Sequence, residues 1–158
     1  MQFVRRLFLL GTHAAMLVVG FALGVYMLPI WVAEAPPPAA QLEAVRTAAQ
    51  FEGRFARDLP GSDFLHWAEG GIFVAPTRIS FEGDMAPGPD YKLYLVPTFV
   101  DTGAEFLALK SRAARIGSIK SFQGFALPVP EGVDVSAYTS AVIWCERFRQ
   151  FISAARYQ

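Results

Sequence analysis

The sequence contains no asparagine, one cysteine and only two histidines among its 158 residues. Without asparagine there is no acceptor for N-linked glycosylation. The single cysteine, Cys145, excludes an internal disulfide and every zinc or redox motif that is built on a CxxC pair. His13 and His66 are too few for a histidine-rich metal centre.

An excess of charge of one sign is also missing, because 14 basic residues balance 14 acidic ones. This balance argues against a nucleic-acid binder, which needs a concentrated basic face. The sequence also lacks a GxSxG elbow, an HExxH pair and a phosphate-binding loop. We therefore expect no substrate turnover, and we do not predict an enzyme.

Charged residues make up 18% of the chain, fewer than the roughly 25% that is usual for soluble domains. Residues 7–33 contain no Asp, Glu, Lys or Arg, and Arg5 and Arg6 precede them. A span needs about 20 apolar residues, and basic residues stay on the cytoplasmic side. We predict that residues 7–33 cross a lipid bilayer once, with residues 1–6 in the cytoplasm and the remainder periplasmic or extracellular.

Two export signals compete with this anchor. Residues 33–35 resemble a signal-peptide cleavage site, but the apolar run is longer than the usual core of about 7–15 residues. Arg5 and Arg6 also resemble the centre of a twin-arginine signal. We favour an uncleaved anchor whose arginines lie at the membrane surface. Within it, Gly20 and Gly24 form a GxxxG pair that permits helix pairing with a membrane protein, a redox partner included.

Residues 34–50 are predicted to form a proline-rich linker followed by a short helix over 42–50. Residues 51–158 contain short apolar runs separated by Gly and Pro, which is typical of an all-β domain. We expect an antiparallel β-sandwich in which Gly70 and Gly71 form a tight turn. Residues 104–115 are ambiguous and could be a helical turn inserted between strands. The predicted strands cover residues 53–59, 64–67, 71–75, 78–81, 91–96, 122–127 and 141–151.

Cys145 lies in the most informative of these strands. Side chains alternate along a strand, so Ile143 and Cys145 face one way while Trp144 and Glu146 face the other. A cysteine among apolar neighbours is by base rate a buried, inert thiol. Arg147, on the same face, offers the opposite expectation of a lowered thiol pKa and a reactive sulfur.

Several motifs along residues 51–158 occur in an order that resembles one known family, the DM13 domain. In its first half these are Gly53-x-Phe55, His66 with Gly70-Gly71, Gly88-Pro89-Asp90, and Tyr94-Leu95. In its second half they are Gly117-Ser118-Ile119-Lys120, Gln123-x-Phe125-x-Leu127-Pro128, Tyr138, Val142-Ile143-Trp144-Cys145-x-x-Phe148, Phe151 and Ala154. Phe125, where the family usually has Tyr, and the pair Ser121-Phe122 depart from the pattern.

The resemblance implies a β-sandwich related to haem- and sugar-binding extracellular domains, with a role in electron transfer. It implies that Cys145 acts as a free thiol or as the ligand of a prosthetic group such as haem. His66 would then be a candidate for the opposite axial ligand, against the ordinary interpretation of a hydrogen-bonded strand residue near a turn. Cys145 could alternatively cycle through a sulfenic acid or a mixed disulfide.

Three functional hypotheses remain open from the sequence. The first is a membrane-anchored module for electron transfer or redox sensing through Cys145. The second is a non-redox binding or adhesion module in which Cys145 is an inert core residue. The third is a scaffold subunit whose membrane span pairs with another membrane protein.

Overall fold

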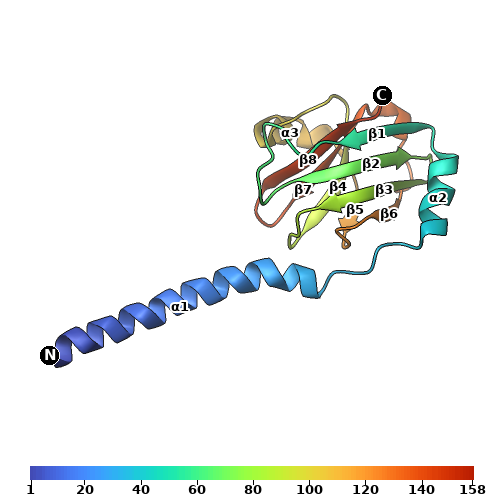
Figure 1. Cartoon of the computed structure of the whole chain (residues 1–158). Helices are drawn as coiled ribbons and strands as arrows, with labels where there is room; N and C mark the ends of the chain where they lie inside the picture. Colours follow the sequence, from blue (N-terminus) through green and yellow to red (C-terminus); the bar gives the residue numbers. More distant parts are fainter. The chain divides into compact units, whose positions relative to one another are not determined.

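The computed structural model describes all 158 residues, which form two compact units, Met1–Val32 and Ala33–Gln158. The first unit is helix α1, Gln2–Trp31 (Figure 1). At 1.5 Å per residue its 30 residues extend about 45 Å, which is long and apolar enough to cross a membrane. His13 hydrogen bonds through Nδ1 to the carbonyl oxygen of Leu9, at 2.7 Å, so its polar ring is satisfied within the helix.

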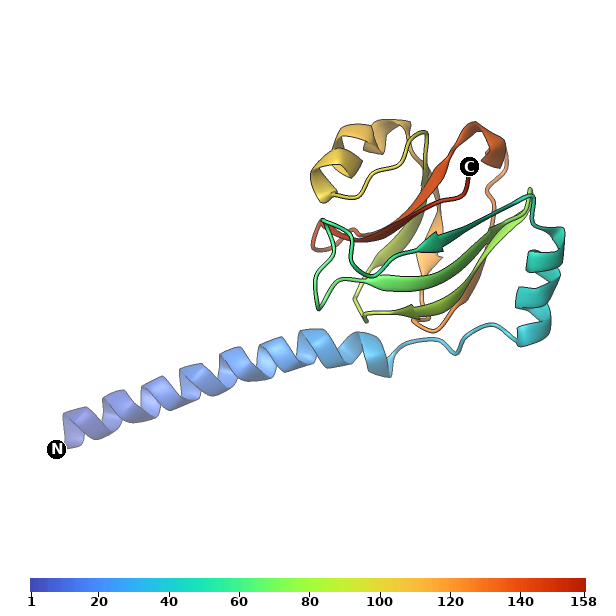
Figure 2. The same ribbon diagram turned by 45° about the horizontal axis from the view of Figure 1, so that its top comes forward.

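The second unit contains two antiparallel sheets of four strands each (Figures 1 and 2). The first sheet has the order β1-β2-β3-β6, with β1 Phe51–Phe55, β2 Ala68–Val74, β3 Arg78–Met85 and β6 Phe125–Pro128. The second has the order β5-β4-β7-β8, with β5 Ala114–Ile119, β4 Tyr91–Val96, β7 Ser140–Cys145 and β8 Gln150–Arg156. The predicted all-β antiparallel sandwich after an N-terminal apolar helix is confirmed.

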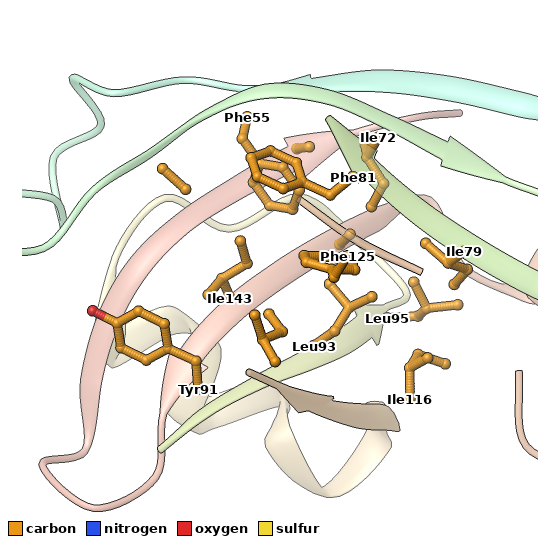
Figure 3. Close-up of a cluster of buried hydrophobic side chains, with 14 of the residues drawn as sticks. Phe55, Ile72, Ile79, Phe81, Tyr91, Leu93, Leu95, Ile116, Phe125 and Ile143 are labelled. Carbon is orange, nitrogen blue, oxygen red and sulfur yellow. The ribbon is translucent and has the colours of Figure 1, made fainter. Parts of the chain in front are cut away.

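Side chains from both sheets meet in a continuous apolar core (Figure 3). The first sheet contributes the aromatic rings of Phe55, Phe81 and Phe125, with Phe81 stacked on Phe125 at 5.3 Å between centroids. The second sheet contributes Leu93 and Ile143 among others. Burial of this apolar surface is the main term that stabilises the sandwich.

Two helices cover parts of the sandwich. Helix α2, Ala39–Ala48, contacts β2, β3 and β6 and buries Val45. Helix α3, Gly103–Leu109, is followed by the 3₁₀ turn Lys110–Arg112; a second such turn, Val135–Ala137, precedes β7. Helix α3 begins at the N-cap Thr102, whose hydroxyl accepts from the Glu105 N–H, while the Glu105 carboxylate accepts from the Asp101 N–H.

Two predicted elements near the start of the domain are wrong. Residues 64–67 are not a strand, because Asp63 accepts a hydrogen bond from the Leu65 N–H at 2.8 Å and holds the backbone in a local turn. Gly70 and Gly71 are not a turn either, but lie inside β2 opposite Gly83 and Glu82. A Cβ atom at Gly70 would lie 2.3 Å from the carbonyl oxygen of Glu82 on β3, so the close approach of the two strands leaves no room for a side chain there.

One predicted strand in the second half is also corrected. The strand predicted over 141–151 is two strands, β7 and β8, separated by a turn at residues 146–149. The helical turn suggested within 104–115 is confirmed as helix α3, which lies between β4 and β5; strand β5 itself was not predicted. The short helix predicted over 42–50 is helix α2, which begins earlier, at Ala39, and ends earlier, at Ala48.

Gly53 permits a close approach between the two sheets. A Cβ atom at this position of β1 would lie 2.3 Å from the carbonyl oxygen of Arg156 and 3.2 Å from the Cα of Tyr157, both backbone atoms of the β8 segment. Backbone atoms of paired strands cannot move aside as a side chain can. The edge of the sandwich at β1 and β8 therefore requires glycine.

We predict that Gly53→Ala destabilises the domain by about 2–3 kcal/mol, because overpacking here forces two backbones apart. Gly117→Ala is the matched control, because its Cβ would meet only the Leu127 side chain at an ordinary 3.5 Å; we expect it to be neutral or stabilising by up to about 1 kcal/mol. Urea unfolding of the full chain in detergent, followed by tryptophan fluorescence, measures both. Equal stability of the two variants would contradict this account of the β1–β8 edge.

Candidate functional site

Cys145 is the last residue of strand β7. It lies at the end of the sandwich where the chain passes from β3 into β4 and from β7 into β8. Its side chain is 1% exposed and packs in the core between the sheets with Ile143 and Tyr91. Figure 3 shows Tyr91 and Ile143 from the same sheet directed into this core. The predicted alternation is confirmed: Ile143 and Cys145 face the inter-sheet core, while Trp144 faces the cluster under α3.

The turn at residues 146–149 closes over the sulfur. Glu146 donates its backbone N–H to the Asp90 carbonyl at 3.0 Å, which ties this turn to the loop before β4. Arg149 adopts a left-handed conformation with φ of 52°, which lets the chain reverse into β8. This local geometry brings backbone N–H groups around the Cys145 side chain.

Burial raises the pKa of the Cys145 thiol above its ordinary value. The backbone N–H groups of Phe148, Asp90 and Arg147 interact with the sulfur and oppose this shift, but they do not overcome it. The nearby charge of Asp90 raises the pKa further. The expectation that Arg147 lowers the thiol pKa below normal is therefore wrong, because desolvation outweighs the donors.

His66 lies in the loop between β1 and β2, where Asp63 holds it. The imidazole Nδ1 is 2.9 Å from each carboxylate oxygen of Asp63, and the two residues also form a pair of backbone hydrogen bonds. Burial raises the pKa of Asp63, but the hydrogen bonds from His66 and Leu65 and the charge of His66 lower it by more. No hydrogen bond or ion pair joins His66 to Cys145, so the structure gives no sign that they act as a ligand pair.

The Cys145 side chain does not fit a haem ligand in this conformation. The sulfur is enclosed by apolar core residues and by the backbone of the 146–149 turn, so no face of it is open to an iron atom. No group of three or more His, Cys, Asp and Glu side chains is arranged to hold a metal ion.

A polar cluster on the opposite face of β7 was not predicted as a site. The Tyr94 hydroxyl donates to Oε1 of Glu146, and Lys110 Nζ donates to Oε2 of the same carboxylate at 2.7 Å. The Lys110 ammonium also lies 5.6 Å from the ring centres of Tyr94 and of Trp144. The only sequence signal for this cluster was the placement of Glu146 on the face of Trp144, since Lys110 comes from a distant segment.

The electrostatics of this cluster follow from burial and pairing. Burial, and next the hydrogen bond to Glu146, raise the pKa of Tyr94 above its ordinary value. Burial also raises the pKa of Glu146, but its bonds with Lys110 and Tyr94 outweigh this and hold the pKa below normal. At neutral pH the cluster is thus a neutral phenol donating to a carboxylate that is paired with an ammonium.

The family model described as electron transfer DM13 matches residues 42–157. This chain belongs to the DM13 family. No curated protein and no solved structure matches it. The match covers the whole sandwich and most of helix α2, so the DM13 unit contains Cys145, His66 and the Tyr94 cluster. Membership indicates a general role in electron transfer.

We predict that Cys145 in the native DM13 domain reacts slowly with a neutral maleimide. The pH at which the reaction rate reaches half of its maximum should lie above the value of about 8.5 for a free thiol.

The pH dependence of stability follows from the raised pKa of the folded state. The protonated thiol contributes fully to stability below the unfolded pKa, and this contribution is lost as pH rises through the folded pKa. Stability should therefore fall above about pH 8.5, and Cys145→Ala should remove that part of the fall. The maleimide reaction rate and the urea concentration at half unfolding, each measured against pH, check the two predictions. A pH of half-maximal reaction rate below that of a free thiol would contradict the raised pKa.

Proposed function

We propose that this chain is a membrane-anchored electron-transfer module whose sandwich lies outside the cytoplasm and whose redox group is the Cys145 thiol. The DM13 match supports the general role. The observation that carries the finer proposal is the placement of Cys145 against the backbone N–H groups of Asp90, Arg147 and Phe148. These donors favour negative charge on sulfur. Arg147 and Phe148 belong to the 146–149 turn, so Asp90 is the one donor that lies outside the segment that must open.

The anchor is supported by helix α1. One side of the apolar segment carries Arg5 and Arg6 and the first charge beyond it is Glu34, which favours a cytoplasmic N-terminus. A signal sequence has the same position and a similar composition, so cleavage is the alternative that a mass measurement on the mature protein distinguishes. Gly20 and Gly24 leave an open strip on α1, where a Cβ atom at either position would meet no atom within 4 Å, and we propose this strip for pairing with a membrane redox partner.

Because Cys145 is the single thiol of the chain, it can form a disulfide only with a partner molecule. The Cys145 thiolate attacks a disulfide of a partner, one sulfur–sulfur bond forms to Cys145, and the partner's other sulfur leaves as a thiolate. The return step needs a second thiolate from the partner, because the chain offers no resolving cysteine. Access to the sulfur requires that the 146–149 turn opens, since Cys145 is 1% exposed when the turn is closed.

A second function is favoured by the same burial. A thiol that is 1% exposed with a raised pKa has the properties of an inert core cysteine. The chain would then be a non-redox binding or structural module, and Cys145 would react only after global unfolding. The two functions differ in which opening event exposes the sulfur.

Three variants separate local opening from global unfolding. Arg149→Val strains the left-handed turn position by about 1–2 kcal/mol, whereas Arg149→Gly relieves it. Gly53→Ala destabilises the β1–β8 edge, and its β8 contacts, Arg156 and Tyr157, lie at the opposite end of β8 from the turn. Under local opening we expect about tenfold faster glutathione-disulfide exchange in Arg149→Val, by the conversion of 1.4 kcal/mol, and no acceleration in Gly53→Ala.

The measurement is the rate at which one glutathione adds to Cys145 in the full chain in detergent, read by intact mass. Acceleration in Gly53→Ala that matches its loss of stability would assign exposure to global unfolding and support the inert module. The redox role itself is tested by protein-film voltammetry and a visible spectrum of the full chain and of Cys145→Ser. A redox signal that survives unchanged in Cys145→Ser would contradict Cys145 as the redox group.

A further inference from the structure

The Tyr94 cluster is a second assembly of redox-capable side chains, separate from the sulfur. Tyr94 is 5% exposed and lies on the face of the second sheet that α3 covers. Its ring centre is 5.2 Å from that of Phe106, and Phe106 is 4.9 Å from Trp144. Glu146 and Lys110 close the cluster toward solvent, with about a quarter to a third of each side chain exposed.

A buried phenol gives up an electron far more readily when its proton can leave in the same step. In this domain the proton acceptor is already in place, because the Tyr94 hydroxyl donates to Oε1 of Glu146. An ionised carboxylate only accepts hydrogen bonds, and the pairing with Lys110 keeps Glu146 ionised and fixed in position. The acceptor therefore needs neither a conformational change nor entry of solvent.

The Lys110 ammonium also disfavours loss of the electron from Tyr94 without loss of the phenolic proton. It lies 5.6 Å from the centre of the Tyr94 ring. A radical cation on that ring would be a positive charge beside a positive charge, in a setting where little water screens them. Loss of the electron is thus favoured only when the phenolic proton leaves with it.

We propose that Tyr94 is a one-electron, proton-coupled redox site of this domain, with Glu146 as its proton acceptor. One electron passes from the phenol to a high-potential one-electron oxidant, of the class of a high-valent metal–oxo centre, which is reduced by one electron. The O–H bond of Tyr94 breaks and the proton forms an O–H bond with Oε1 of Glu146, which leaves a neutral tyrosyl radical and a neutral carboxyl group. Reduction by one electron returns the proton to Tyr94.

Tyr157 is the matched control for this site. It is also buried, and burial raises its pKa as well, but its hydroxyl donates to the backbone carbonyl of Val135 at 3.0 Å. A backbone carbonyl does not accept a full proton at neutral pH. The two tyrosines thus share burial and differ in having a base at the hydroxyl.

The test is flash photo-oxidation of the full chain in detergent with tris-bipyridine ruthenium and an irreversible electron acceptor, with the radical read by transient absorption and electron paramagnetic resonance. We expect a tyrosyl radical in the wild type, loss of most of it in Tyr94→Phe, and no change in Tyr157→Phe. Glu146→Gln should slow radical formation about a hundredfold, which is the low end of what a positioned proton acceptor contributes. An equal radical yield in Tyr94→Phe, or a wild-type rate in Glu146→Gln, would overturn the proposal.

Two further arms keep this test decisive. In the wild type we expect the rate to fall in deuterium oxide and to stay constant from about pH 6 to pH 9, a range in which a carboxylate remains ionised. A rate that rises with pH would mean that solvent takes the proton and would also overturn the proposal. The series repeated in Cys145→Ser should give the same result, because Tyr94 acts without the thiol, so failure here is distinguishable from failure of the Cys145 proposal.

Discussion

Burial of strand β7 on both of its faces is the constraint on which the rest of this structure depends. All six residues from Ser140 to Cys145 are buried, because the inter-sheet core covers one face and helix α3 with its apolar neighbours covers the other. The period of two along the strand then assigns successive side chains to different environments. Cys145 enters the core between the sheets, while Trp144 joins the aromatic cluster.

The end of this strand concentrates the polar chemistry of the domain in neighbouring residues. Cys145 is held in an apolar setting that favours the neutral thiol, and only backbone N–H groups favour the thiolate. Glu146, the next residue, leaves the core and pairs with Lys110 and Tyr94. The buried thiol and the base of the Tyr94 phenol therefore come from two consecutive residues, Cys145 and Glu146.

The two redox sites proposed for this DM13 domain would work by different physical routes. Sulfur chemistry changes a bond and needs contact with a partner atom, so at Cys145 it would depend on the opening of the 146–149 turn. Transfer of one electron from an aromatic side chain needs no such contact and tolerates burial, provided that the proton has a destination. The closed 146–149 turn would block disulfide exchange at Cys145. The same turn begins with Glu146, the proposed proton acceptor of Tyr94, so it would be part of the one-electron route.

The sequence by itself determined the class of fold, the apolar N-terminal helix and the faces of β7, because each follows from a periodicity or a composition that neighbouring residues share. It also determined that no internal disulfide exists, since Cys145 is the only cysteine. It did not separate β7 from β8 or find β5, because the turn at Arg149 depends on a backbone angle and not on Gly or Pro.

Only the tertiary structure decided the environment of each candidate residue. The local pattern left two environments open for Cys145, a buried inert thiol among apolar neighbours and a reactive one beside Arg147. The fold surrounds the sulfur with core side chains, and desolvation outweighs the nearby donors. Lys110, Tyr94 and Glu146 come from three separate segments, and no local pattern joins them. Periodicity records which way a side chain points, whereas the pKa of a group depends on everything that packs against it.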